Sequence, residues 1–384
     1  MPIDSTYLLD TLKKSIQINS ITPVEEDLAA FFADEIRKLG IEPEWDVVAP
    51  GRPNVYAVAD LGPSDEMLLL TGHLDTVDIA ADWETDPFNP VEKDGKLYGL
   101  GSFDMKSGVV CCFAAFKALV EDYALKGKLG KIAFAATVDE EGYGTGAEAL
   151  LKSPLGKADG ILLTEPFWGT KEMPVPLGLT GKVLYKLTVT GKMAHAFFPE
   201  RGRNAIEDAG KIVAALNQLN LYEHPRFGCG NYSTLKIEGG YQEYAVVVPE
   251  RCEVIITRLT VPGENRDSAL ADMHQLIDSL DLACDVEIET APPFYEPYVI
   301  ETNSRLAQSF SAAYQQQVGR PPDYKFTRCI TDGNIYVGNA NIPTITFGPR
   351  GGGAHECNEF VEIDSLTPVA QVLVDSCTTY YATE

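Results

Sequence analysis

Short apolar runs of strand length alternate with helical segments along most of this chain, and this rhythm constrains the fold more than any other feature. The runs lie at 67–71, 131–138, 160–164 and 343–347, and a helix with an apolar face is predicted at 106–121. Continuous apolar runs are typical of strands that are buried on both faces of a sheet. Since parallel strands need crossover helices between them, we predict an α/β fold with a mostly parallel sheet.

The stretch from 180 to 293 has a different rhythm. Its predicted strands and helices follow the order β-α-β-β-α-β and lie at 182–190, 204–219, 233–237, 253–260, 265–280 and 284–289. This order is the ferredoxin-like arrangement, which forms a self-contained α+β unit. We therefore predict a discontinuous main domain of 1–179 and 294–384, interrupted by an inserted domain of 180–293.

Charge and cysteine usage exclude several classes of protein. The 384 residues include 56 Asp and Glu against 31 Lys and Arg, a net charge of −25. This excess argues against binding to nucleic acid and against attachment to an anionic membrane surface. No apolar run is long enough to span a membrane, and no signal peptide is visible. Because the eight cysteines are scattered without a C-x-x-C pair, we expect a reduced, cytoplasmic protein.

Acidic residues and histidines follow the predicted strands where each strand ends. TGHLD places His73 and Asp75 after the first strand, DEEGYG places Glu140 and Glu141 after the second, and LLTEP places Glu165 after the third. Two Gly-containing segments, YGLGSFDMKSG and GPRGGGAHECNE, contribute Asp104 and His355. In open α/β sheets the carboxyl ends of the strands meet at one crevice. We therefore expect these side chains to converge.

The chemistry of this set is that of a divalent metal site. Carboxylate and imidazole ligands suit zinc or a similar first-row ion, and the absence of Cys argues against a structural zinc site that is closed to water. Glu140 and Glu141 can divide labour beside a metal, one as a ligand and the other as a base for water. Asp75 can accept a hydrogen bond from the second ring nitrogen of His73 and fix its tautomer.

Seven segments, taken in order, resemble the signatures of a known family. They read GHLDTV, YGLGSFDMKSG, DEEGYGTGA, GKMAHAFFPERGRNAI, RLTVPGE, TDG and FGPRGGGAHECNEFV. Each is weak alone, but together they cover almost the whole chain. They resemble the dinuclear zinc family of acetylornithine deacetylase, succinyl-diaminopimelate desuccinylase, aminoacylase and glutamate carboxypeptidase. The resemblance implies a zinc-peptidase-like catalytic domain and an inserted lid that often dimerises, so we expect a homodimer.

The same resemblance implies a role for each matching position. Glu140 is then the general base, and Asp75 orients the first metal ligand. The implied metal ligands are His73 and Glu165 for one ion, Glu141 and His355 for the other, and Asp104 as the bridge between them. The implied cofactors are two divalent ions, with zinc as the first choice and cobalt or manganese as alternatives. Water activated between the ions attacks an amide carbonyl.

Two residues of the inserted domain also match the family. His195 in GKMAHAF resembles the histidine that stabilises the oxyanion, often in the partner subunit. Arg258 resembles the arginine that holds the substrate carboxylate, with a buried ion pair as its alternative. Arg328, before TDG, is a candidate anion contact. Three positions depart from the family pattern and leave acyl and amine specificity open: Leu100, Val246 and Thr257.

We therefore expect a metal-dependent hydrolase that cleaves the amide bond of an N-acyl amino acid, as a deacetylase or desuccinylase does. A dipeptidase or carboxypeptidase would share all the metal residues and stays an alternative. A non-catalytic protein that binds an amino-acid derivative is a further alternative, although the retention of Glu140 speaks against it. The expected partner is a small N-acyl amino acid or dipeptide, with neither nucleic acid nor membrane.

Overall fold

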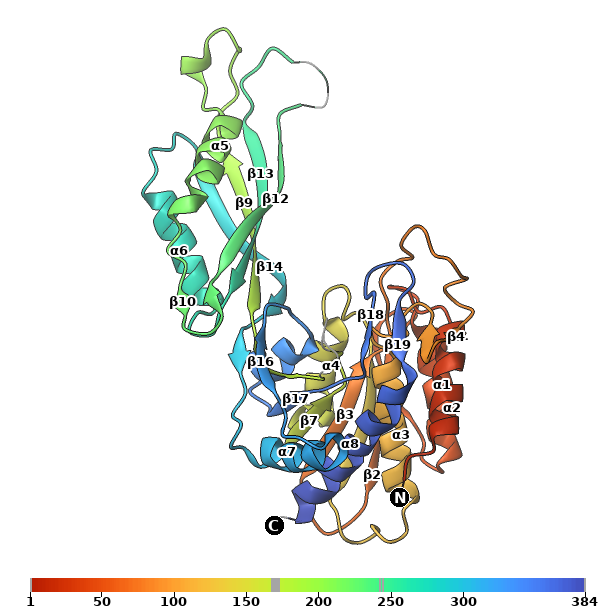
Figure 1. The fold of residues 1–384 in the computed structure, drawn as a ribbon. Coiled ribbons are helices and arrows are strands. Elements are labelled where there is room, and N and C mark those ends of the chain that lie inside the picture. Colours follow the sequence, from red (N-terminus) through yellow and green to blue (C-terminus); the bar gives the residue numbers. More distant parts are fainter. Residues whose placement is uncertain (1, 167–172, 242, 244, 383–384) are drawn as a thin grey trace. The chain divides into compact units, whose positions relative to one another are not determined.

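The computed structural model describes residues 2–166, 173–241, 243 and 245–382, and the chain divides into two compact units (Figure 1). Unit 1 comprises Met1–Leu177, Ile300–Lys325 and Thr331–Glu384, and unit 2 comprises Gly178–Val299 and Phe326–Ile330. Unit 2 therefore starts before and ends after the predicted insertion of 180–293, and it takes in five further residues downstream.

Unit 1 is built on a six-stranded sheet with the order β1-β2-β6-β3-β7-β17. The strands are Glu44–Ala49 (β1), Arg52–Asp60 (β2), Met67–His73 (β3), Lys131–Thr137 (β6), Gly160–Leu163 (β7) and Thr344–Thr346 (β17). Strands β6, β3, β7 and β17 run parallel, while β1 and β2 add an antiparallel edge. Because all seven residues of β3 are buried, both faces of the sheet are covered. The predicted mostly parallel α/β fold is confirmed.

The helices of unit 1 bury their apolar sides against this sheet or against one another. They are Ser5–Gln17 (α1), Glu26–Lys38 (α2), Lys106–Glu121 (α3), Thr145–Lys152 (α4), Arg305–Val318 (α7) and Ile363–Ala382 (α8), with short helical turns at Pro154–Lys157 (η1) and Asn334–Asn339 (η4). Phe32, Phe113, Phe116 and Phe134 come from α2, α3 and β6, and their ring centroids lie 5.2–6.4 Å apart. Burial of such aromatic rings dominates the energetics of a core.

Two smaller sheets occur elsewhere in the described part of the chain. Val91–Lys93 (β4), Lys96–Tyr98 (β5), Gly351–Gly352 (β18) and Phe360–Glu362 (β19) form an antiparallel sheet in unit 1. Val175–Leu179 (β8), Tyr298–Val299 (β15) and Tyr324–Thr327 (β16) form a three-stranded sheet. The chain passes between the units within β8, directly after β15, within β16 and again after Ile330.

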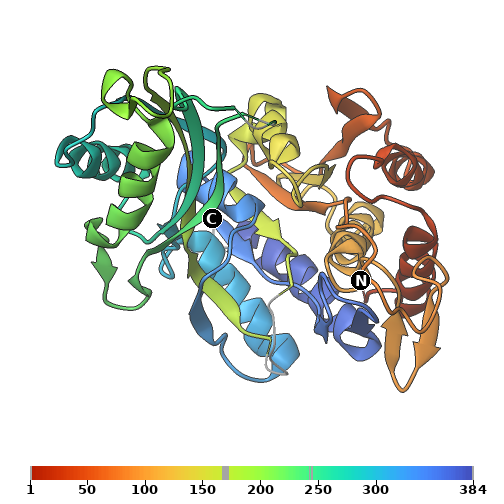
Figure 2. The same ribbon diagram turned by 90° about the horizontal axis from the view of Figure 1, so that it is seen from above.

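Unit 2 carries an antiparallel sheet with the order β12-β13-β9-β14. Its elements are Gly181–Thr190 (β9), Ala205–Ala215 (α5), Asn231–Gly239 (β12), Arg251–Thr260 (β13), Arg266–Asp278 (α6) and Asp285–Tyr295 (β14). The remaining short elements are Pro199–Arg201 (η2), Leu216–Gln218 (η3), Glu223–His224 (β10) and Gly228–Cys229 (β11). Alternate residues of β9 are buried against the two helices. The order β-α-β-β-α-β is the one predicted. Figure 2 shows the same ribbon from above.

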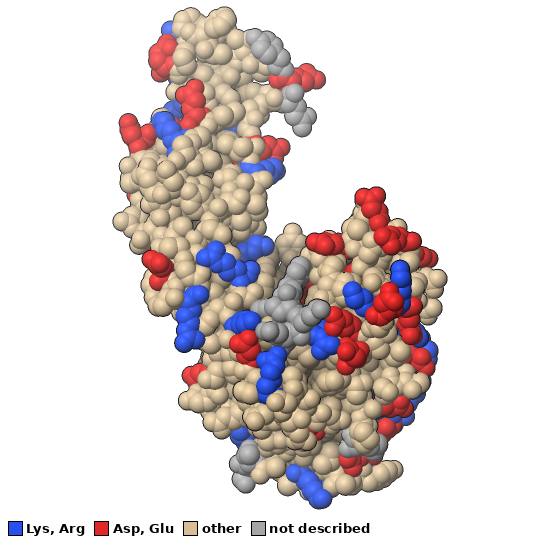
Figure 3. Space-filling view, viewed as in Figure 1, with Lys and Arg blue, Asp and Glu red and all other residues tan. Residues whose placement is uncertain are grey.

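Most acidic side chains belong to the surface. Figure 3 shows acidic side chains gathered on the part of unit 1 around β4, where the exposed acids include Asp82, Glu84, Asp86, Glu92 and Asp94. The net charge therefore bears on solubility more than on chemistry. Within the described part of the chain, no helix combines the length and the apolarity that crossing a bilayer requires.

Candidate metal centre

Three neighbouring parallel strands end at the candidate site. His73 is the last residue of β3, the Glu140–Glu141 pair lies in the turn after β6, and Glu165 follows β7. His355 lies in the loop between β18 and β19, and Asp104 lies in the turn before α3. The local cause is the one expected from the sequence, because parallel strands deliver their carboxyl ends to the same edge of the sheet.

The first group of atoms surrounds the His73 ring. Its Nε2 lies 3.4 Å from Asp104 Oδ1, 3.6 Å from Glu165 Oε2 and 3.9 Å from Glu140 Oε2. Among the described residues, His73 Nε2, Asp104 Oδ1 and Glu165 Oε2 are buried and have no hydrogen-bond partner. Buried polar atoms normally have partners, and three that converge on one point fit a cation between them.

The second group lies around His355. Its Nε2 is 2.8 Å from Glu141 Oε1 and 3.5 Å from Asp104 Oδ2. Asp104 thus turns one carboxylate oxygen toward each histidine, as a bridging ligand would. Ligand atoms of His73, Asp104 and Glu141 lie within 4.8 Å of one another. The donors are imidazole nitrogens and carboxylate oxygens, which suit zinc and similar first-row ions.

Asp75 organises the turn that carries Glu140 and Glu141. Its carboxylate accepts the backbone N–H of Glu140 at 3.2 Å and that of Glu141 at 3.0 Å, and Thr22 donates its hydroxyl at 2.9 Å. The ring Nδ1 of His73 lies 2.9 Å from the backbone oxygen of Asp75 and 3.5 Å from its carboxylate. The shorter contact to the histidine thus comes from the Asp75 backbone, because the carboxylate serves the turn.

Glu359 performs the corresponding task for Asp104. Its buried carboxylate accepts the backbone N–H groups of Gly101, Phe103 and Asp104 at 2.7–2.8 Å. Burial and the nearby Asp104 raise the pKa of Glu359 to about 8. Glu359 therefore stabilises the loop that carries Asp104.

The crowding of buried acids alters their proton affinities. Burial, together with Asp104, raises the pKa of Glu165 to about 8. Burial and the charge of Glu165 raise the pKa of Glu140 well above its ordinary value. The hydrogen bond to Glu141 raises the pKa of His355 to about 9. In the metal-free protein these groups hold protons that bound cations would displace.

Asp332 is a site residue that sequence reasoning missed. It is 1% exposed and accepts the hydroxyl of Thr137 at 3.2 Å. Burial raises the pKa of Asp332 to about 7. The negative charge of Asp332 in turn contributes to the raised pKa of Glu140. The only signal was the TDG segment, which matches the family without indicating that residue 332 packs beside the end of β6.

His195 lies in unit 2, on the exposed loop after β9. The loop is held by bridging to Val247, and the backbone N–H of Phe197 donates to Nδ1 of the ring at 3.2 Å. Since Nδ1 accepts, the neutral ring carries its proton on Nε2. The rings of Phe197 and Phe198 lie 5.3 and 5.9 Å from the imidazole. His195 can therefore act as a hydrogen-bond donor through Nε2.

Arg258 lies on β13 and is fully buried. Its Nη2 donates to Asp272 at 2.9 Å and to the backbone oxygen of Asn220 at 3.2 Å, and it also pairs with Glu264. This geometry favours the buried ion pair that the sequence left open as the alternative to binding a substrate carboxylate. Two acids of the same unit already engage the guanidinium, so a substrate carboxylate would have to displace one of them.

Arg328, the candidate anion contact, is also used within unit 2. Its Nη2 donates to the backbone oxygens of Phe227 and Cys229 at 2.8 and 3.1 Å. These contacts fix the β10–β11 hairpin to the segment before TDG. They give Arg328 a structural task that does not depend on an anion.

Comparison with known proteins agrees with this geometry. The model of peptidase family M20/M25/M40 matches residues 69–378. The chain belongs to this family. It is a metal-dependent hydrolase of amide bonds, and the family-level prediction is confirmed.

Curated relatives match over nearly the full length. Succinyl-diaminopimelate desuccinylase of Cupriavidus necator is 29% identical over 392 residues, covering 96% of this chain and 97% of its own. N-Formyl-4-amino-5-aminomethyl-2-methylpyrimidine deformylase of Bacillus subtilis is 26% identical, covering 91% and 88%. Among solved structures, aminopeptidase PepT of Bacillus cereus superposes with a TM-score of 0.78 at 21% identity, covering 98% of this chain and 99% of its own. The latter likeness concerns the fold alone.

Proposed function

We propose that this M20-family member is a deacylase, which hydrolyses the amide bond between a small acyl group and the amine of an amino acid or a similar amine. The observation that carries the proposal is the end-to-end similarity to enzymes named for removing a succinyl or a formyl group. The convergent buried atoms of His73, Asp104 and Glu165 support metal dependence.

Five side chains would hold the metal ions, in the arrangement that the resemblance implies. His73 and Glu165 would bind one ion, Glu141 and His355 the other, and Asp104 both; the distances of 2.8–3.6 Å within these groups support that division. Bound ions would supply Lewis acidity toward the carbonyl and lower the pKa of water. We propose zinc as the resident ion, because the donors are nitrogen and oxygen.

Glu140 would be the base. Its carboxylate takes a proton from the attacking water and returns it to the nitrogen of the leaving amine. As the resemblance implies, Nε2–H of His195, from this chain or from a second copy of it, would donate to the oxygen of the carbonyl as negative charge develops there.

The proposal is tested with a substrate panel. N-Acetyl, N-succinyl and N-formyl amino acids are compared with dipeptides, each assayed with zinc and with cobalt. We expect the highest kcat/KM on one N-acyl class. A preference for dipeptides would favour the peptidase alternative, and no turnover on any substrate with either metal would favour a binding protein.

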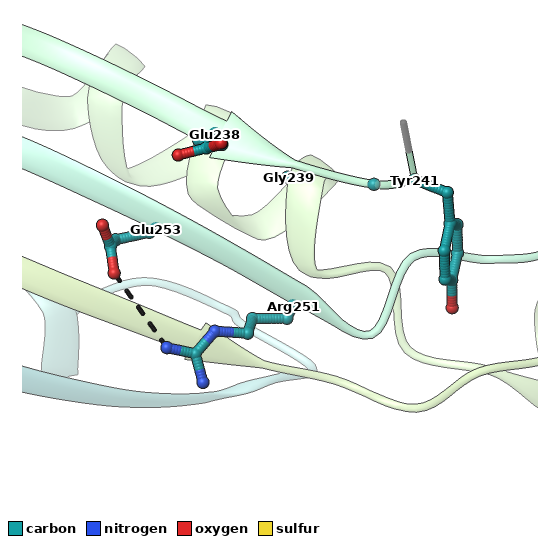
Figure 4. A pocket seen from close by; sticks show the side chains of 6 residues that line it. Glu238, Gly239, Tyr241, Arg251 and Glu253 are labelled. Atoms are coloured by element: carbon teal, nitrogen blue, oxygen red, sulfur yellow. Dashed lines mark ion pairs between the residues drawn. The ribbon is translucent and has the colours of Figure 1, made fainter. Parts of the chain in front are cut away.

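We also propose a homodimer formed through unit 2. Strand β12 is an edge of the four-stranded sheet, and Leu235 and Ile237 on it are 58% and 51% exposed. Edge strands with exposed apolar side chains are templates for pairing with another chain. Figure 4 shows the end of this strand, where Tyr241 and Arg251 line a cavity of about 320 Å³.

The dimer is tested by sedimentation. We expect a mass twice the 41.9 kDa of one chain, and we expect Ile237→Lys to shift the equilibrium to the monomer because a charge on a buried edge is costly. Val47→Lys is the control, since Val47 is 69% exposed on β1, the edge strand of the six-stranded sheet of unit 1. A wild-type monomer at micromolar concentration would contradict the proposal. Equal dissociation of the dimer in both variants would also contradict it.

We further propose a cytoplasmic location, which the eight free cysteines support.

A further inference from the structure

The loop that carries Glu140 is held from behind by strand β2. Asn54, which is buried, accepts the backbone N–H of Val138 at 3.0 Å and donates to the backbone oxygen of Gly146 at 2.9 Å. The two ends of the loop thus meet at one side chain. The backbones of Val138 and Gly146 lie so close together that a Cβ on Gly146 would be 2.2 Å from the backbone oxygen of Val138.

Arg52, two residues earlier on the same strand, reaches the first residue of the turn. Its Nη1 lies 2.9 Å from Asp139 Oδ1. Its Nε and Nη2 engage the carboxylate of Glu25, the residue that precedes α2. The side chains of Glu25 and Asp139 are 0% and 3% exposed, and that of Arg52 is 15% exposed. One guanidinium therefore forms ion pairs with two buried carboxylates.

Asp139 needs this support because of its backbone. Its φ is +69°, in the left-handed region that non-glycine residues rarely occupy. Its second carboxylate oxygen accepts the hydroxyl of Thr145 at 2.5 Å, and its backbone oxygen accepts N–H groups of Gly142 and Gly144. Surrounding contacts must over-determine such a conformation for it to persist. The next two residues are Glu140 and Glu141, so the direction in which they leave Asp139 depends on these contacts.

We infer that Arg52 is a positioning residue for the Glu140–Glu141 pair, acting through Asp139. Asp75 holds one side of the turn, because its carboxylate accepts the backbone N–H groups of Glu140 and Glu141. Arg52 holds the other side through its ion pair with Asp139. Loss of the Arg52–Asp139 ion pair would let the backbone of the turn move, and Glu140 and Glu141 would move with it. Planar, two-sided pairing of this kind suits arginine and is not reproduced by lysine. The expected effect of Arg52 on turnover rests on the proposed function.

The test compares Arg52→Met with Arg305→Met. Arg305 is the matched control, since it also pairs with a carboxylate through two contacts, to Glu66, and donates to a backbone oxygen, that of Tyr380. In the metal-free protein, we expect Arg52→Met to increase amide hydrogen exchange of residues 138–146 selectively. With metal, we expect kcat to fall by about 10–100-fold, as is usual when an outer partner of a metal site is lost, with KM within about twofold. Arg305→Met should lower only the melting temperature.

Further variants keep the inference open to refutation. Arg52→Lys should recover little of the lost kcat, and Asp139→Asn, a milder change, tests the same contact should Arg52→Met not fold. Unchanged exchange of 138–146 in Arg52→Met or Asp139→Asn would overturn the inference, as would full recovery in Arg52→Lys. Wild-type protein without turnover on any substrate would instead refute the proposed function, and the exchange measurement would still decide the role of Arg52.

Discussion

Replacing Glu140 with glutamine is expected to lower kcat by about 10²–10⁴-fold, the contribution of a general base, while the metal content stays at the wild-type level. Glutamine keeps the shape of the side chain but cannot take a proton from water. Glu140 is mostly buried and has a raised pKa because of burial and the charge of Glu165. Turnover with saturating substrate and metal analysis of the same sample measure the two quantities.

Glu356→Gln serves as the control for that experiment. Glu356 is an exposed acid directly after His355, so its loss changes the charge near the site without touching the proposed base. We expect it to leave kcat within about twofold of the wild type. Near-normal turnover of the Glu140 variant would exclude it as the base. Loss of metal from that variant would identify Glu140 as a ligand instead.

Metal affinity is expected to fall by at least about 100-fold for each ion between pH 8 and pH 6. Ligands must release their protons before they bind a cation, and in the metal-free protein the pKa of Glu165 is about 8 and that of His355 about 9. Below these values each ion displaces at least one proton, since the charge of Glu165 and hydrogen bonds to acids raise the pKa of His73 as well, so its affinity changes at least about tenfold per pH unit. Calorimetric titration in buffers of different ionisation enthalpy measures both affinity and proton release.

The stability of the metal-free protein should change in the opposite direction. Glu165 and His355 both have folded-state pKa values above their ordinary ones, so both bind protons more tightly in the folded state. Their contribution is fully present below the unfolded-state pKa and is lost as the pH rises through about 8 to 9. The melting temperature without metal should therefore fall between pH 6 and pH 9, and the gain on adding metal should grow. Glu165→Gln should flatten both trends, and a pH-independent affinity would contradict the assignment.

The sequence was sufficient for the fold and for the convergence of the chemically active residues. Both rest on short-range rules: continuous apolar runs indicate buried parallel strands, and parallel strands end at one edge. His73 ends its strand, and Glu141 and Glu165 follow theirs within a few residues, so their meeting could be predicted. Their roles as metal ligands stay a prediction.

Long-range side-chain pairing could not be predicted. Nothing near Arg52 in the sequence indicates that its guanidinium joins Glu25 and Asp139, since the three residues meet only when α2, β2 and the turn after β6 pack together. Arg258 illustrates the reverse case. Its segment matches the family, but whether an arginine faces a ligand or two acids depends on packing of α6 against the sheet of unit 2.

The place of the insertion affects how the protein is made. Strand β17 completes the sheet beside β7, yet the ribosome synthesises unit 2 between these two strands. At about 5–20 residues per second, the 122 residues from Gly178 to Val299 alone delay the synthesis of β17 by roughly 6–25 s. During this interval the nascent chain carries an uncovered strand edge, the kind of surface that recruits other chains. Conditions that slow translation of the insertion should therefore increase aggregation or chaperone binding of this protein, even though the finished fold leaves that edge covered.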